Sequence, residues 1–500
     1  MKKIVLLPLD ERPCNSDFVV RLFNHDSIEI VKPKELGHYK EPADYDEIRT
    51  FLLKECQDAD ALIISLDMLL YGGIVPSRLH HEKLETLLSR MDTIRKIRNS
   101  NPNIMIYAFQ CVMRCPNDSS SEEEPDYYDH FGLKIHDLGV AVHKARMGEN
   151  KSRVISLLRE QIDYSALEDY ISRRDLNLRL NLNTLDFLMD HTIDALVIPR
   201  DDSTEFGYPA MDEEIIRERI SEIDISDRVL IYPGADEVAL TLLSRIVNRL
   251  NVGKPKVYIK YASDSSGEII PLYEGNALAT TIRYHVLSAG CQMTESYEQA
   301  DIILVVLAPS SGMIEAEYQP STSPSYCVDR LLVELIEFIQ DRITEGKIVT
   351  IADDAYANGG DLEFLHLMNK ADLIMKVDGY AGWNTNSNTL GTALAEAVDS
   401  YYFGKSKQHN NFLVERYLED GGYCALVRWQ VSKGLSSVDV GCILDSRKEE
   451  QAVEEIYMGL KCFLNKTLSS IAGETKITKL LLPWHRMFEV NLEAEYLERQ

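Results

Sequence analysis

The chain has 500 residues, of which 45% are hydrophobic and 27% are charged. This length allows for more than one domain, and the composition is typical of a globular protein with a sizeable core. The formal net charge of -27 argues against nucleic acid as a partner, because phosphate contacts need clustered Lys and Arg, and against docking on an anionic membrane.

The N-terminal segment carries no recognisable export signal. Its apolar run from Ile4 to Leu9 ends at Asp10 and is too short for the core of a signal peptide. No apolar run reaches the roughly 18 residues that a membrane-spanning helix needs. The nine cysteines are scattered, and Cys111 and Cys115 lack a second pair at metal-binding spacing. We therefore expect a cytoplasmic protein with reduced thiols.

Apolar runs with the length of β-strands recur along most of the chain. The expected strands are Lys3–Leu9, Ile28–Val31, Ala61–Leu66, Ile104–Phe109, Ala195–Pro199, Val229–Tyr232, Val257–Tyr261, Ile302–Leu307, Ile348–Ile351 and Leu373–Val377. Most are separated by roughly 15 to 30 residues, which is enough for a crossover helix with its loops. The runs are continuous rather than alternating, as in parallel strands that are covered on both faces. The sequence therefore predicts an α/β fold with mostly parallel strands and crossover helices.

Two architectures are compatible with this number of strands. One is an elaborated (β/α) barrel, and the other, which we favour, is a pair of α/β lobes divided near Leu250–Pro255. The expected domains are residues 1–250, with a helical insertion at about 130–190, then a second lobe at 251–395 and a mainly helical region at 396–500. The polar stretch Pro116–Pro125 is expected to be a surface loop.

Polar side chains follow nearly every expected strand. The candidates for binding or catalysis are Asp10, Arg12, Asp67, Arg78, Arg200, Asp201, Asp202, Asp236, Glu237, Asp353, Asp354, Trp383, Asn384 and Asn388. Any one of them could be a helix cap or a turn residue. Because the ends of parallel strands share one edge of a sheet, their recurrence predicts that they converge on one cleft.

Asp201-Asp202 is the sharpest of these elements. Two close carboxylates cannot both ionise easily, so the pKa of one rises and that group can act as an acid near neutral pH. The structural alternative is that one Asp caps the next helix and the other pairs with Arg200. The pairs Asp353-Asp354 and Asp236-Glu237 offer the same chemistry and are also candidates for substrate binding.

Arginines and an Asn-rich loop complete the expected cleft. Arg12, Arg78, Arg114 and Arg200 could bind an anionic group of a substrate or could balance the crowded carboxylates. In the loop that begins at Gly379, Trp383 offers a flat apolar face, and Asn384 and Asn388 offer neutral donors and acceptors. This combination suits a sugar. The alternative is an ordinary turn in which Trp383 fills the core.

Motifs for a metal or a cofactor are weak. The sequence contains no His-x-x-x-His and no Cys-x-x-Cys, although an all-oxygen site for Mg²⁺ or Ca²⁺ built from the Asp pairs stays open. Neither a phosphate-binding glycine motif nor a Gly-x-Ser-x-Gly elbow is present. We therefore expect no cofactor and assign no metal ligand.

The chain also resembles, along essentially its whole length, a bacterial family catalogued as a domain of unknown function. The matching stretches are Leu6–Pro13, Ser65–Gly73, Arg200–Asp202, Gly234–Glu237 and Gly382–Thr385. A second, local resemblance is to substrate-assisted N-acetylhexosaminidases, carried by Asp201-Asp202 and the later Trp383-Asn384 and Asn388. That resemblance implies that Asp201 orients the acetamido group of the substrate and that Asp202 is the acid and base.

These patterns favour a glycoside hydrolase that acts on a small carbohydrate, with an amino sugar or an anionic sugar as compatible substrates. Two alternatives stay open. One is a metal-assisted hydrolase or isomerase of a small anionic metabolite, and the other is a non-catalytic sugar-binding protein. The sequence is compatible with a homo-oligomer but does not specify the oligomeric state.

Overall fold

The computed structural model describes residues 1–498, which form two compact units. The first unit contains Met1–Glu11, Asn24–Val238 and Tyr273–Gly275, and the second contains Arg12–Phe23, Ala239–Leu272 and the chain from Asn276 onward. Each unit is built around its own parallel sheet. The α/β class with parallel strands and crossover helices is therefore confirmed, and the two separate sheets match the two-lobe alternative rather than a barrel.

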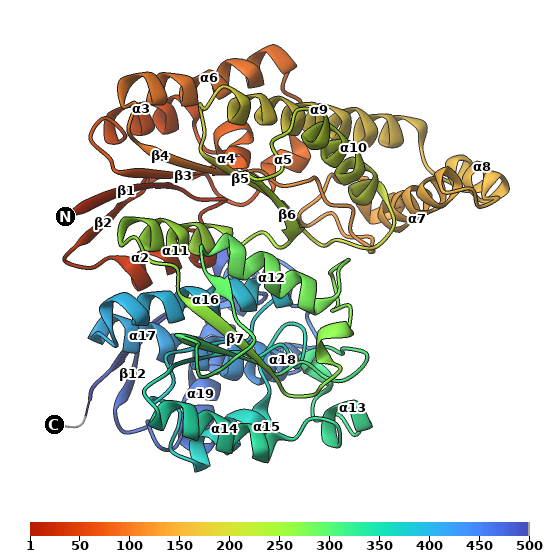
Figure 1. Ribbon diagram of the computed structural model, residues 1–500. Coiled ribbons are helices and arrows are strands. Elements are labelled where there is room, and N and C mark those ends of the chain that lie inside the picture. The colour runs from red at the N-terminus through yellow and green to blue at the C-terminus, as the bar shows by residue number, and fades with distance from the viewer. Residues whose placement is uncertain (499–500) are drawn as a thin grey trace. The chain divides into compact units, whose positions relative to one another are not determined.

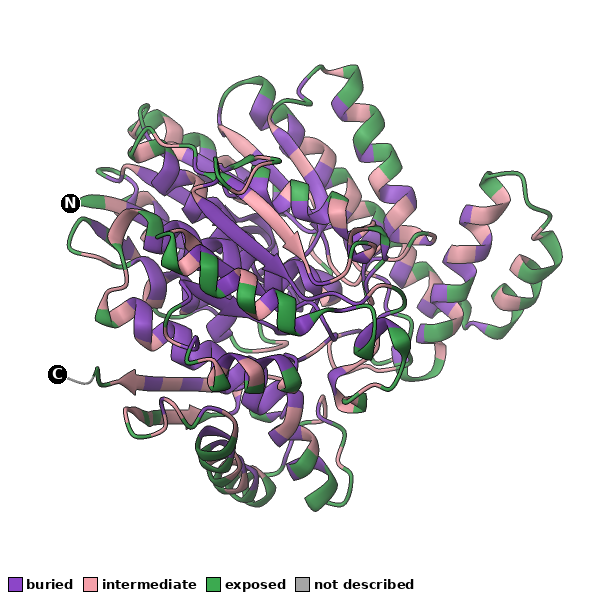
Figure 2. Cartoon of the chain, turned by 60° about the horizontal axis from the view of Figure 1, so that its bottom comes forward, coloured by how far each residue is buried: buried purple, intermediate pink, exposed green. Residues whose placement is uncertain are grey.

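The sheet of the first unit has six parallel strands in the order β2-β1-β3-β4-β5-β6. Their bounds are β1 Lys2–Leu7, β2 Ile28–Val31, β3 Ala61–Ser65, β4 Met105–Phe109, β5 Ala195–Arg200 and β6 Val229–Pro233. Leu7 lies opposite Ile64, and Ile64 lies opposite Ala108. Most residues of the central strands are buried, as Figure 2 shows, which explains their continuous apolar runs. All six carboxyl ends lie on one edge.

The helices of the first unit pack on this sheet and extend beyond it. Their bounds are α3 Tyr45–Glu55, α4 Leu66–Tyr71, α5 Pro76–Leu79, α6 Leu84–Ser100, α7 Tyr128–Arg146, α8 Ser152–Gln161, α9 Tyr164–Met189 and α10 Tyr208–Glu222. Leu52 of α3 and Ile94 of α6 share a core with Val5 and Leu62 of the strands. Helices α7 and α8 reach away from the sheet (Figure 1), and no residue of α8 is buried.

The second unit repeats the strand order of the first. Its parallel sheet runs β11-β10-β9-β7-β8, so the second strand lies outside the first and the later strands follow on the other side, as in β2-β1-β3-β4-β5. In such sheets ligands bind where the order reverses, between the first and third strands. The bounds are β7 Lys256–Tyr261, β8 Gln292–Met293, β9 Ile302–Val306, β10 Ile348–Ala352 and β11 Gly379–Ala381.

The remaining elements of the second unit are mostly helical. They are α1 Pro13–Ser16, α2 Phe18–Phe23, α11 Val238–Leu250, η1 Ser266–Glu268, α12 Leu278–Ser288, η2 Ala316–Tyr318, α13 Pro324–Cys327, α14 Leu332–Thr344, α15 Leu362–Lys370, α16 Asn386–Phe403, α17 Lys407–Arg416, η3 Tyr417–Val427, α18 Arg428–Gly434, α19 Ser446–Thr467, β12 Thr475–Leu481, η4 Pro483–His485 and β13 Asn491–Tyr496. The segment η3 is a π-helix, a rare form that is frequent at functional sites. None of the helices among the described residues is long and apolar enough to cross a membrane.

Two expectations about this part of the chain need correction. The expected strand Leu373–Val377 is wrong, because these residues form a turn after α15 in which the Val377 N–H donates to the Leu373 carbonyl. The run is apolar because Leu373, Ile374 and Val377 are all buried in the core, and the strand begins only at Gly379. The C-terminal region is helical as expected, but the antiparallel hairpin of β12 and β13 was not expected.

The π-helix η3 and the long helix α19 pack so closely that a side chain larger than hydrogen would not fit between them. A Cβ added to Gly459 would lie 2.6 Å from a methyl carbon of Val427, which is a stiff β-branched side chain. We therefore expect Gly459→Ala to lower the free energy of unfolding by about 1 kcal/mol, although Ala ordinarily favours a helix over Gly by about that amount. Urea denaturation would measure the change.

Gly473→Ala is the matched control, because nothing lies within 4 Å of the Cβ it would add. It should leave stability unchanged or raise it slightly. If Gly459→Ala were stabilising, the close packing of α19 on η3 would be disproved.

Candidate active site

The carboxyl edge of the first sheet collects acidic side chains from four strands. Asp10 follows β1 and Asp67 follows β3, so the two flank the point where the strand order reverses. Both are buried. The other acids on this edge are Asp201 and Asp202 after β5, and Asp236 and Glu237 after β6.

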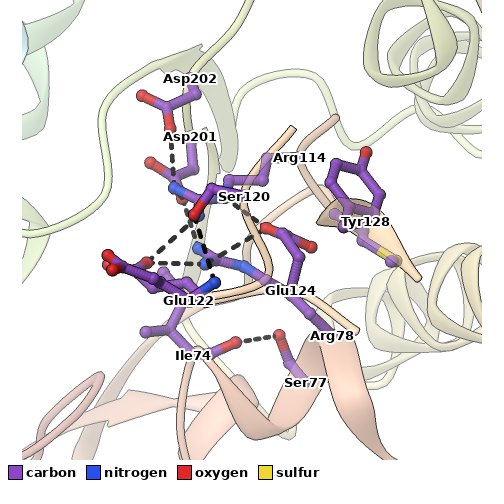
Figure 3. A network of polar contacts seen from close by, with 12 residues as sticks. Ile74, Ser77, Arg78, Arg114, Ser120, Glu122, Glu124, Tyr128, Asp201 and Asp202 are labelled. Carbon is purple, nitrogen blue, oxygen red and sulfur yellow. Dashed lines mark hydrogen bonds and ion pairs between the residues drawn. The ribbon is translucent and has the colours of Figure 1, made fainter. Parts of the chain in front are cut away.

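Two arginines bind the Asp201-Asp202 pair (Figure 3). Arg78, from α5, donates from Nη2 to Oδ2 of Asp201 at 2.7 Å. Arg114, which follows β4, donates from Nη1 to Oδ2 of Asp202 at 2.7 Å, and the same nitrogen lies 3.8 Å from Asp201. The side chains of Asp201 and Asp202 are 19% and 31% exposed, so both carboxylates remain open to a small ligand.

The same arginines also bind two glutamates that sequence reasoning missed. Arg78 Nη1 lies 3.0 Å from Glu123, while Arg114 lies 3.2 Å from Glu123 and 2.8 Å from Glu124. Both glutamates belong to the stretch Pro116–Pro125; the sequence predicts a surface loop there, but Glu124 is buried. The run Glu122-Glu123-Glu124 was the only available signal. Four carboxylates therefore share two guanidinium groups.

Burial raises the pKa of several carboxyl groups on this edge. Burial, and then the charge of Asp201, raise the pKa of Asp202 to about 6, against the opposing effect of Arg114. Burial likewise raises the pKa of Glu124. The pKa of Asp67 is raised to about 6 by burial, although its carboxylate accepts the Cys111 N–H at 2.9 Å. Near pH 6 the edge can therefore hold both protonated and ionised carboxyl groups.

The backbone at Asp202 adds a second unusual feature. Its φ of 41° lies in the left-handed region, which non-glycine residues seldom adopt and in which Asp and Asn are the best tolerated. Strained residues of this kind cluster at functional sites. Asp202 is thus distinguished by its charge environment and by its conformation.

The other expected residues of the first unit have structural partners. Arg200 pairs with Glu213 of α10 at 2.7 Å. The Glu237 carboxylate accepts the Ala235 N–H at 3.0 Å. Asp236 and Glu237 are both buried.

The remaining candidates belong to the second unit. They are Arg12, Asp353, Asp354, Trp383, Asn384 and Asn388. The expectation that all strand ends share the edge of one sheet is therefore wrong, because the chain forms two sheets and has two such edges. The strand order that separates them depends on long-range pairing, which local sequence patterns do not reveal.

A small pocket in the second unit brings together several of these residues. Its walls include Arg12, Asn358, Trp383, Asn384, Glu419 and Arg428, and its volume of about 20 Å³ leaves room for one small polar group. Asn384 has a φ of 53°, again in the left-handed region. The guanidinium of Arg12 lies 4.7 Å from the centre of the Trp484 ring.

Trp383 is largely packed inside the second unit. Its side chain meets Phe18 edge to face, with ring centres 5.9 Å apart, and its Nε1–H donates to Thr392 at 3.1 Å. Only 8% of Trp383 is exposed. Asn388 lies in the first turn of α16, and its buried Oδ1 has no hydrogen-bond partner among the described residues. The ring thus packs in the core of the second unit, and Trp383 also borders the pocket.

Asp353 and Asp354 lie at the carboxyl end of β10 and are both buried. Oδ2 of Asp353 accepts hydrogen bonds from the Tyr380 hydroxyl and the Asp361 N–H, both at 2.7 Å. Burial, and then the charge of Asp361, raise the pKa of Asp353 to about 7. Asp353 is therefore better suited to hold the fold together than to face a substrate.

The chain matches one protein family over nearly its whole length. Residues 4–493 match a family model described as "Protein of unknown function (DUF4127)". The chain belongs to the DUF4127 family. No curated protein matches this DUF4127 chain.

Within residues 1–498, no group of three or more His, Cys, Asp or Glu side chains is arranged to hold a metal ion. The chemistry of this DUF4127 member must therefore be argued from its own residues.

The raised pKa of Asp353 makes a prediction about stability and pH. A carboxyl that binds its proton more tightly in the folded state contributes stability below about pH 4, and this contribution is lost as the pH rises towards 7. The amide of Asp353→Asn resembles the protonated acid and does not ionise. We expect the variant to be about 1–3 kcal/mol more stable than the wild type at pH 8, and about equal at pH 4.

Urea denaturation at both pH values would measure this difference. Asp341→Asn is the control, because Asp341 is exposed on α14 and its replacement should not alter the pH dependence. An unchanged pH dependence in Asp353→Asn would show that Asp353 is ionised without cost in the folded protein.

Proposed function

We propose that this DUF4127 protein is a glycoside hydrolase that acts on a small carbohydrate, with Asp201 and Asp202 as its catalytic carboxylates. The observation that supports this proposal is the adjacent pair at the end of β5, in which Asp202 has a pKa of about 6 beside the charge of Asp201. Most glycoside hydrolases cleave the glycosidic bond with two carboxyl groups that differ in environment and in protonation state.

In this proposal the two carboxyl groups divide the work. Asp202, protonated near pH 6, gives its proton to the leaving glycosidic oxygen, and the water that then attacks the anomeric carbon returns a proton to Asp202. Asp201 lies beside Arg78, at 2.7 Å, and stabilises the oxocarbenium-like transition state. With an N-acetylated amino sugar, Asp201 would instead orient the acetamido group of the substrate as the nucleophile. Arg114 restrains Asp202 and limits how far its pKa can rise.

Asp10 and Asp67 are the proposed acceptors for sugar hydroxyls. They flank the point of strand reversal in the same sheet, where ligands of such folds bind. Carboxylates accept several hydrogen bonds each, which suits the dense donors of a sugar. Arg78 and Arg114 would also tolerate an anionic substituent on the substrate.

Replacing Asp202 tests the proposed acid. On alkyl glycosides, whose leaving group needs a proton, Asp202→Asn should lower kcat by about 100-fold or more. On nitrophenyl glycosides the loss should be smaller, because nitrophenolate leaves without help. In the wild type, kcat/KM should fall as the pH rises through about 6, and this decline should be absent in Asp202→Asn.

A panel of both substrate types, with and without a chelator, would provide the measurements. Asp227→Asn, at an exposed position of the first unit, is the control and should retain full activity. Activity that survives both Asp201→Asn and Asp202→Asn would refute the assignment. Activity that is lost only on chelation would favour the metal-assisted alternative.

A further inference from the structure

Arg428 is a buried cation in the wall of the second unit's pocket. It is the first residue of α18, directly after the π-helix η3, and its side chain is 2% exposed. Nη1 donates to the Phe488 carbonyl and Nη2 donates to the Asn358 carbonyl, both at 2.7 Å. Nε is buried and has no hydrogen-bond partner in the described chain.

Other buried arginines of the second unit have a carboxylate beside them. Arg330 lies 2.7 Å from Asp361, and Arg416 lies 2.9 Å from Asp420. Within residues 1–498, Arg428 has no carboxylate at ion-pair distance. Its charge is compensated by carbonyl oxygens and by the rings of Trp429 and Phe488, centred 4.8 and 5.6 Å away. A buried charge without a counter-charge is unfavourable, so one is expected to come from elsewhere.

The surroundings of Arg428 do not supply that counter-charge. Glu419 and Glu489 also line the pocket, but Glu419 pairs with Arg416, and Glu489 lies 3.2 Å from Arg486. Arg12 adds a further guanidinium to the walls. The lining thus holds two arginines and two glutamates, and both glutamates are already paired with arginines other than Arg428.

We propose that this pocket binds the carboxylate group of a small ligand, with Arg428 as its counter-charge. A carboxylate carries one negative charge, which matches one uncompensated guanidinium, and its planar shape fits the free N–H groups of Arg. The volume of about 20 Å³ leaves room for a small polar group, with the rest of the ligand outside, and a single negative charge matches Arg428 better than the higher charge of phosphate. This inference does not depend on the proposed glycosidase activity.

The carboxylate could belong to a simple organic acid or to a sugar acid. Acetate and pyruvate represent the first source, and glucuronate represents the second, with neutral glucose as its matched partner. Titration calorimetry and thermal melting of the full chain should show binding of at least one of these carboxylates. Glucuronate should bind more tightly than glucose if a sugar acid is the natural ligand, and inorganic phosphate should bind more weakly than the carboxylates.

Substitution of Arg428 tests the assignment. Arg428→Gln should weaken carboxylate binding by about tenfold or more, and Arg428→Lys should weaken it less, because Lys keeps the charge but loses the planar donor pair. Arg447→Gln removes the same charge from an exposed position of α19 and should leave binding unchanged. Equal binding in the wild type and Arg428→Gln would overturn the proposal, as would a wild type that binds none of the three carboxylates.

A second variant keeps the test decisive if Arg428→Gln does not fold. Glu489→Gln removes a negative charge from the pocket and releases Arg486, so it should tighten carboxylate binding by about threefold. If neither Arg428→Lys nor Glu489→Gln changed the affinity, Arg428 would have only the structural role of joining the Phe488 and Asn358 segments.

Discussion

Charge balance at the carboxyl edge of the first sheet constrains the rest of that unit. Arg78 and Arg114 are shared by Glu123, Glu124, Asp201 and Asp202, so two guanidinium groups face four carboxyl groups. Burial, and then the charge of Asp201, raise the pKa of Asp202 to about 6, and the ion pairs of the glutamates fix the path of the chain. The polar loop before α7 folds inward because its glutamates find their partners there.

The second unit resolves a similar conflict differently. There Arg416 lies between Asp420 and Glu419, and its guanidinium lies 3.9 Å from the centre of the Phe18 ring. The acids are deeply buried, and burial raises the pKa of Asp420 to about 7. The charged cluster of the first unit is partly exposed. The second unit buries Arg416 beside partners of opposite charge, but among the described residues Arg428 is buried without a carboxylate partner.

The elements that the sequence predicted correctly are those that a local pattern of apolar residues specifies. Parallel strands covered on both faces must be apolar throughout, so β1 and β9 could be read directly. The hairpin of β12 and β13 has no such run, because its residues alternate in exposure, and β11 has only three residues. Asp201 and Asp202 were found because they follow the end of a strand. Glu123 and Glu124 follow no strand and reach the site through ion pairs with Arg78 and Arg114, which a sequence pattern does not reveal.

The position of α1 and α2 in the chain has a consequence for synthesis. Arg12–Phe23 belongs to the second unit, but the whole of Asn24–Val238 is translated before the rest of that unit begins. Phe18 and Leu22 are buried in the folded protein. During synthesis, however, the residues they pack against are not yet translated while the first unit is being made. The nascent chain of this protein should therefore carry a short apolar helix without its packing partners for much of its elongation.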